Sequence, residues 1–118
     1  MELVAFIGSD TENWGQITAL LKHMSWDSAI LVKGKNTHNF PKTDNAAILE
    51  IDTSKPLAEI TSILKEKLKS RLSGEFEVAL SLASGSGKEH MALISALLNV
   101  PVGIKLAVFT KKGIEFIT

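Results

Sequence analysis

A glycine-rich turn is the segment of this sequence best suited to chemistry. Ser84-Gly85-Ser86-Gly87-Lys88 follows an apolar run and precedes a stretch with helical periodicity. Glycine lets a backbone approach a ligand closely and adopt positive φ, and the first N–H groups of the following helix would point at the same place. Two serine hydroxyls and a lysine ammonium add donors and a positive charge. The pattern therefore predicts a site for a phosphate or another small anion.

Two common nucleotide-binding motifs do not fit this turn. A Walker A loop would need glycine five residues before Gly87, where Leu82 stands, and serine or threonine where Glu89 stands. A dinucleotide fingerprint would need a third glycine at the position of His90. These departures argue against an ATPase. The alternative interpretation is a plain strand-to-helix turn, but two glycines, two serines and a lysine together favour a ligand role.

A second polar turn, Gly8-Ser9-Asp10-Thr11, follows the apolar run Leu3–Ile7. In an open parallel sheet, ligands bind beyond the carboxyl ends of the strands where strand order reverses, so both turns line one crevice if their strands are neighbours. Ser9 also starts a possible capping box with Glu12, which gives it a competing structural role. Because Asp10 would repel a phosphate, we expect it to face outward or to bond to the loop. The residues expected to bind the ligand are Gly8, Asp10, Thr11, Ser84, Gly85, Ser86 and Gly87.

Other polar residues carry weaker signals. His23, His38 and His90 fall in three different predicted segments, and their spacing predicts no shared metal site. The polar stretch Lys33–Asn45 has no clear periodicity and is long for a loop in a compact domain. We interpret its lysines as solvated loop charges. The alternative is that they close over an anion, which makes this stretch the predicted cover of the site.

The elements that must position these turns alternate along the chain. Apolar runs predict strands at Leu3–Ile7, Ala29–Val32, Ala46–Ile51, Phe76–Leu82, Ile104–Phe109 and Ile114–Ile117. Helical periodicity predicts helices over Trp14–Met24, from Pro56 to a stop near Gly74, and over Lys88–Leu98. This alternation predicts an α/β fold: a Rossmann-like three-layer domain over residues 1–118, with a mostly parallel six-stranded sheet and a C-terminal antiparallel hairpin.

The composition excludes several classes of protein. Among 118 residues, 13 basic and 13 acidic side chains cancel, so duplex DNA is an improbable partner. No apolar stretch approaches the roughly 20 residues of a membrane span, and Met1–Ile7 is typical of a first strand rather than of a signal peptide. The absence of cysteine excludes disulfides and fits a reducing cytoplasm. We expect a single domain with no further domain fused to it.

The whole chain resembles the CARF family, the CRISPR-associated Rossmann-fold domains. That family typically carries Asn-x-Ser/Thr-Gly-Gly-Thr-Lys after its fourth strand, followed by an amphipathic helix. Here the corresponding stretch is Leu82-Ala83-Ser84-Gly85-Ser86-Gly87-Lys88. The first glycine and the lysine match, the second glycine is displaced by one position, and the asparagine is absent.

The resemblance implies a ligand and a reaction. CARF domains form homodimers and bind cyclic oligoadenylates, the second messengers of type III CRISPR antiviral defence, across the dimer interface. A stand-alone member resembles a ring nuclease, which cleaves the messenger without a metal or other cofactor, and we expect cyclic tetra-adenylate as the messenger here. By this resemblance Ser9 and Lys88 are the catalytic residues. The alternatives are a non-catalytic sensor or sponge for the messenger, and an unrelated Rossmann-like module that binds a mononucleotide.

Overall fold

One mostly parallel sheet organises the chain in this computed structural model, which describes residues 1–72 and 74–118. Within those residues the strands are β1 (Glu2–Ile7), β2 (Ala29–Gly34), β3 (Ala46–Ile51), β4 (Glu77–Ser81), β5 (Gly103–Thr110) and β6 (Gly113–Phe116). The helices are a 3₁₀ turn, η1 (Thr11–Asn13), followed by α1 (Trp14–His23), α2 (Leu57–Leu72) and α3 (Gly87–Leu98). The predicted order of strands and helices is confirmed.

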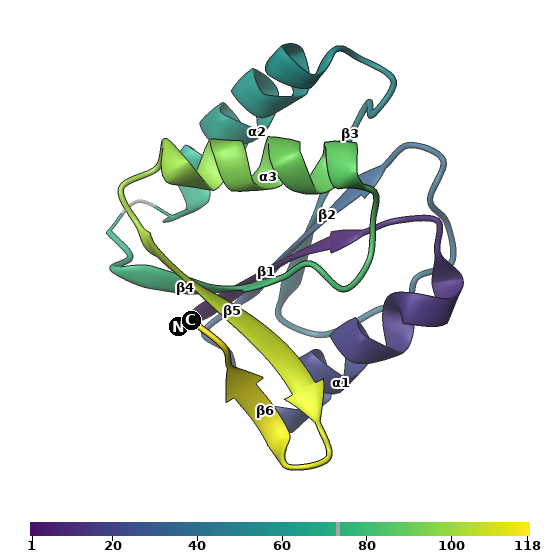
Figure 1. Cartoon of the computed structure of the whole chain (residues 1–118), viewed down its shortest axis with the longest axis vertical. Coiled ribbons are helices and arrows are strands. Elements are labelled where there is room, and N and C mark those ends of the chain that lie inside the picture. The colour runs from purple at the N-terminus through teal and green to yellow at the C-terminus, as the bar shows by residue number, and fades with distance from the viewer. Residues whose placement is uncertain (73) are drawn as a thin grey trace.

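The strands lie in the order β3-β2-β1-β4-β5-β6 (Figure 1). The first five are parallel, and β6 runs antiparallel to β5. From β1 the chain builds outward through β2 and β3, then returns through α2 to place β4 on the other side of β1. Strand order therefore reverses between β1 and β4. The predicted α/β class, the six-stranded mostly parallel sheet and its C-terminal hairpin are confirmed.

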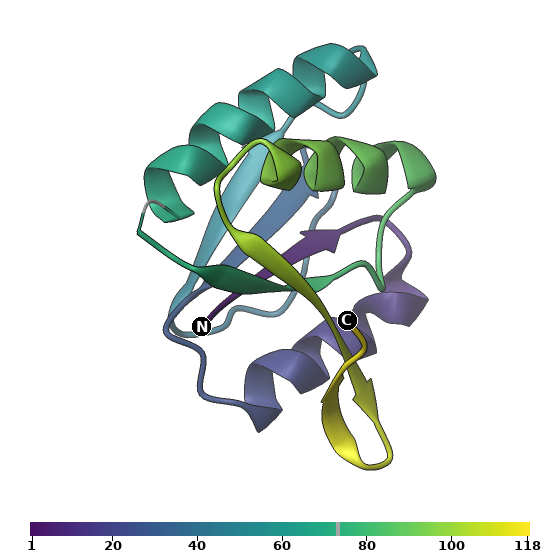
Figure 2. The same cartoon turned by 60° about the vertical axis from the view of Figure 1, so that its left-hand side comes forward.

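Helices cover both faces of the sheet. α2 and α3 lie side by side over one face, and α1 lies against the other (Figures 1 and 2). Along β1, Val4 and Phe6 pack in the α2–α3 layer, whereas Ala5 and Ile7 pack beneath α1. Because both faces are covered, β1 is apolar throughout, and these four side chains are at most 1% exposed.

The crossover from β2 to β3 contains no helix among the described residues. Parallel neighbours are usually joined through a helix, but here residues 35–45 return along the α1 face as an irregular loop. Phe40 anchors the loop by meeting the ring of Trp14 edge-on, with centroids 5.3 Å apart. In the part of the chain that the structure describes, no helix covers the outer part of β3 on this face, and Ile48 is 49% exposed.

The start of α1 differs from the prediction. The expected capping box from Ser9 to Glu12 is wrong, because α1 begins at Trp14 and its N-cap, Asn13, makes no side-chain capping bond. The chain first forms η1, whose N-cap Asp10 also makes no capping bond. The reason is that the Asp10 side chain bonds to the β4–α3 turn and to Asn13 instead.

The β5–β6 hairpin extends beyond the rest of the sheet beside α1 (Figure 2). Only the first half of β5, residues 103–106, pairs with β4. Farther along β5, the side-chain carboxamide of Gln16 on α1 makes the hydrogen bonds that a neighbouring strand would make. It donates to the Phe109 carbonyl at 2.8 Å and accepts from the Phe109 amide at 3.1 Å. This pairing satisfies the backbone where β5 leaves the sheet.

Candidate functional site

The two predicted turns meet at the carboxyl edge of the sheet. β1 and β4 are neighbours, so the turn at Gly8 and the turn at Ser84–Lys88 leave adjacent strands. The Gly8 amide donates to Ser84 Oγ at 2.8 Å. A Cβ on Gly8 would lie 2.6 Å from the Gly85 Cα, so only glycine permits this approach. The prediction that both turns line one region is confirmed, at the point where strand order reverses.

Asp10 joins the two turns. Its Oδ1 accepts hydrogen bonds from Ser84 Oγ at 2.7 Å and from the Gly85 amide at 3.0 Å, and its Oδ2 accepts from Asn13 at 2.7 Å. Burial raises the pKa of the Asp10 carboxyl, but the bonds from Asn13, Ser84 and Gly85 outweigh burial and leave the pKa below its ordinary value. Asp10 therefore bonds to the loop, which is one of its two predicted placements. Its carboxylate accepts the Gly85 amide hydrogen, so that amide is not available to a phosphate oxygen.

Ser84 is fully buried, and its polar atoms are used within the fold. Its hydroxyl accepts from Gly8 and donates to Asp10. Its carbonyl lies 2.6 Å from His90 Nε2 and, because a carbonyl only accepts, that nitrogen carries the hydrogen. Gly85 has φ +107°, and a Cβ there would lie 2.9 Å from Phe6. Ser84 and Gly85 thus shape the turn, and His90 is a support that the sequence did not indicate.

The start of α3 offers the open donors of the site. Ser86 and Glu89 form a capping box, in which the Ser86 amide donates to Glu89 at 2.7 Å and the Glu89 amide donates to Ser86 Oγ at 3.2 Å. The next two residues, Gly87 and Lys88, are exposed, and neither of their amides donates to an acceptor within the described residues. Ser9 is also exposed. The Thr11 amide is already used, because it donates to the Ser9 carbonyl. The helix dipole makes the two open amides favourable for an anion.

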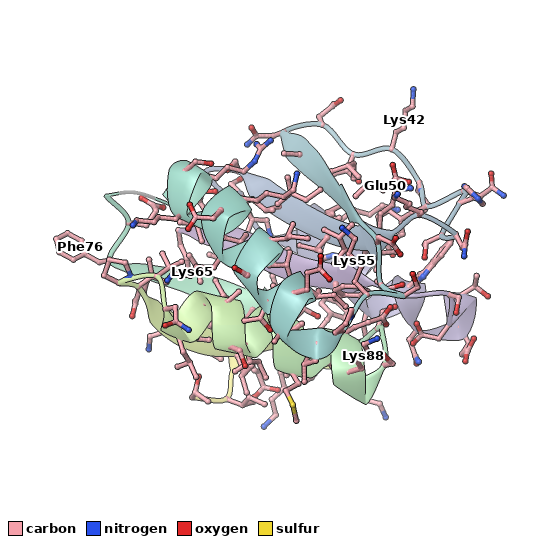
Figure 3. All side chains as sticks on the ribbon, turned by 90° about the horizontal axis from the view of Figure 1, so that it is seen from above. Lys42, Glu50, Lys55, Lys65, Phe76 and Lys88 are labelled. Carbon is pink, nitrogen blue, oxygen red and sulfur yellow. The ribbon has the colours of Figure 1, made fainter. Side chains whose placement is uncertain are left out.

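The Lys88 side chain contacts the segment after β3. Its ammonium donates to the Thr53 carbonyl, just after β3, at 3.1 Å. Figure 3 shows Lys88 toward the same end of the paired helices as Lys55, while Phe76 projects from the other end. Lys88 is exposed, and within residues 1–72 and 74–118 this bond to Thr53 is the one that its ammonium makes. The contact with Thr53 was not predicted, because nothing in the sequence links the end of β3 to the start of α3.

The loop after β2 is linked to the first of these turns through Trp14, which meets Phe40 edge-on and donates its indole N–H to the Gly8 carbonyl at 2.9 Å. Within residues 1–72 and 74–118, no hydrogen bond joins residues 35–45 to the turn at Ser84–Lys88, so its predicted role as a cover stays a prediction. Lys33 donates to the Thr37 carbonyl at 2.8 Å and pairs with Glu50 at 3.6 Å. The described part of the chain holds no group of three histidine or acidic side chains placed to bind a metal.

Comparisons with known proteins indicate no function, so the functional argument rests on the geometry of the site. No protein-family model matches the chain, and a search of curated proteins finds no match to its sequence. In the part of the chain that the structure describes, no helix is long and apolar enough to cross a membrane.

Proposed function

We propose that the protein is a Rossmann-like domain that binds a cyclic oligoadenylate, with cyclic tetra-adenylate as the first candidate, at the carboxyl edge between β1 and β4. The observation that carries this proposal is the pair of open amides at Gly87 and Lys88, which start a 12-residue helix beside the exposed Ser9. Strand order β3-β2-β1-β4-β5, with ligand donors at its reversal point, supports the Rossmann-like assignment.

One phosphate fits each copy of the site. The amides of Gly87 and Lys88 are consecutive in the first turn of α3, and the Asp10 carboxylate keeps a second anion away from Gly85. A cyclic tetra-adenylate carries several equivalent phosphates around a two-fold axis, so a homodimer would present the same pair of amides twice. The affinity for the ring would then exceed the affinity for one phosphate, because the second contact is intramolecular.

The exposed face of α3 is the proposed homodimer surface. Met91 and Leu98 stand seven residues apart and therefore share one helix face, and they are 57% and 72% exposed. Light scattering should find a dimer, and Leu98→Glu should shift it toward monomer. If light scattering finds that the wild-type protein is a monomer, the proposed two-fold site is wrong.

We further propose that the bound ring is cleaved. A ribose 2′-oxygen would attack its own 3′-phosphate, so that the new P–O2′ bond replaces the P–O5′ bond. The attacking 2′-hydroxyl gives up its proton to solvent, the 5′-oxygen takes one from solvent and leaves as a hydroxyl, and the product is linear with a 2′,3′-cyclic phosphate. Such a step depends on in-line positioning and on stabilising the charge of the pentacoordinate phosphorus. Lys88, released from Thr53, and the amide donors would hold that charge, while Ser9 would orient the ribose or phosphate.

Binding without turnover is the second candidate. It is favoured by the engagement of the Lys88 ammonium with Thr53 and by the use of the Ser84 hydroxyl within the fold. In this case the protein would act as a sensor or sponge for the messenger.

Incubation with cyclic tetra- and hexa-adenylate in EDTA separates these functions. Linear products that disappear in Lys88→Ala, and fall in Ser9→Ala, would support cleavage. Tight binding without products would support the sensor. Lys112→Ala is the matched control, because Lys112 is exposed in the distant β5–β6 turn. If neither ring binds while a mononucleotide does, the mononucleotide-binding alternative replaces both.

A further inference from the structure

The loop between β2 and β3 roofs a cavity of about 470 Å³ on the α1 face of the sheet. Leu31, Ala46 and Ile48 line its sheet side, and Phe40 and Pro41 line its loop side. The volume lies within the range of small-molecule sites, roughly 300–1,000 Å³. The cavity exists because an irregular loop, rather than a helix, joins these two strands. It belongs to a different region of the sheet from the turn at Ser84–Lys88.

The loop over the cavity is held in an unusual backbone conformation. Asn39 (φ 68°) and Asn45 (φ 62°) are the two non-glycine residues with positive φ among residues 1–72 and 74–118, and both belong to this loop. Asn45 is fixed by hydrogen bonds to the carbonyls of Trp26 and Asp27, at 3.2 and 2.7 Å. Left-handed backbone outside glycine gathers at functional positions more often than elsewhere.

The charges around the cavity favour an acid. Lys33 lies in the wall with its side chain 20% exposed, and its ammonium contacts the Thr37 carbonyl at 2.8 Å and Glu50 at 3.6 Å. An ammonium has three hydrogens, so one remains for a ligand. Lys42 projects outward from the loop (Figure 3), and Asp44 lies on the same rim, so these two charges offset each other. Glu50 neutralises Lys33 only in part, because the pair is 3.6 Å apart and Glu50 is half exposed, so the remaining Lys33 hydrogen is the donor for an acidic group.

We propose that this cavity is a second ligand site, for a small, flat, apolar molecule that carries one acidic group. The apolar body would lie on Ile48 beneath Phe40, and the acidic group would accept the remaining Lys33 hydrogen. Burying the exposed face of Ile48 provides the driving force, and the ammonium selects an acid over a neutral molecule of the same shape. This site is independent of the oligoadenylate proposal.

Two fluorescent probes that share an apolar body test the proposal. Anilinonaphthalene sulfonate carries an acidic group, and N-phenyl-naphthylamine does not. We expect saturable binding of the sulfonate, tighter than that of the neutral probe by about fivefold. Lys33→Met should remove this preference without weakening the neutral probe. Ile48→Trp should fill the cavity and abolish saturable binding of both.

Matched variants keep the test specific to the cavity. Phe76→Ser removes an aromatic side chain that is 93% exposed elsewhere, and Lys111→Gln removes a distant exposed lysine. Both should bind the probes as the wild type does, and amide shifts in NMR spectra should stay within residues 31–48. Unchanged binding in Ile48→Trp, or lost binding in Phe76→Ser, would overturn the site. Equal affinities for the two probes would overturn the preference for an acid.

Discussion

The chain leaves its parallel strands in two contrasting ways. Where β1 and β4 end, the turns are so close that two glycines touch and a carboxylate joins them. Where β2 ends, a long loop spans to β3 over a cavity, and its contacts are an edge-on aromatic pair and the hydrogen bonds of Lys33 and Asn45. The first region uses most of its polar groups internally, so the groups left for a ligand are the exposed Ser9 and the start of α3. The second keeps an apolar surface accessible.

Replacing Gly8 with alanine should have the largest effect, because it separates the two tight turns. The new Cβ would meet Asp10 Oδ1 at 2.5 Å and the Gly85 backbone at 2.6 Å, so the backbone must move. We expect Gly8→Ala to lower the free energy of unfolding by about 3 kcal/mol, measured by urea denaturation.

Gly15→Ala is the matched control for this substitution. Gly15 lies in α1 and is exposed, and a Cβ there would have no neighbour within 4 Å. It should stabilise the protein by about 0.5–1 kcal/mol, because alanine favours a helix over glycine. A tolerated Gly8→Ala would show that the turns are less closely packed than the structure indicates.

Asp10 gives the tight region a pH dependence. Its pKa is depressed in the folded chain, so its contribution to stability is present above the unfolded pKa and is lost as pH falls through the folded pKa. Asp10→Asn keeps an acceptor but removes the charge, and it should lower the free energy of unfolding by about 1–2 kcal/mol at neutral pH. As the pH is lowered from neutral to pH 3, the melting temperature should fall less in Asp10→Asn than in the wild type.

Phe40→Ala probes the loop in the same manner. The substitution removes the edge-on contact with Trp14, a pair worth about 0.5–1.5 kcal/mol beyond its buried area, and enlarges the cavity. We expect a loss of about 1–2 kcal/mol in the free energy of unfolding. Hydrogen exchange should accelerate in residues 35–45 while the amides of β1 and β4 stay protected. Equal acceleration in both regions would mean that the loop and the tight turns open together.

Much of the fold could be predicted because local patterns determine it. Apolar runs bounded by polar turns placed the strands within one or two residues, and β3 was predicted with its observed bounds, Ala46–Ile51. The polar turns were predicted as one region because parallel strands share a carboxyl edge. The partners of Asp10 were not specified, since they lie 74 and 75 residues away in the sequence. Two serines each preceded an acidic residue by three positions, and only tertiary contacts decided that Ser86, rather than Ser9, caps a helix.

The smallest predicted effect separates the two asparagines that give the loop its shape. Asn39 adopts φ 68° with no side-chain hydrogen bond in the described residues, so Asn39→Gly relieves a left-handed conformation at little cost and should change stability by less than about 0.5 kcal/mol. Asn45 adopts φ 62° but also bonds the Trp26 and Asp27 carbonyls, so Asn45→Gly should lose about 1 kcal/mol despite the same backbone benefit. Urea denaturation of both variants measures the difference. If the two substitutions cost the same, backbone conformation alone holds the loop, and the Asn45 side chain does not attach it to the segment before β2.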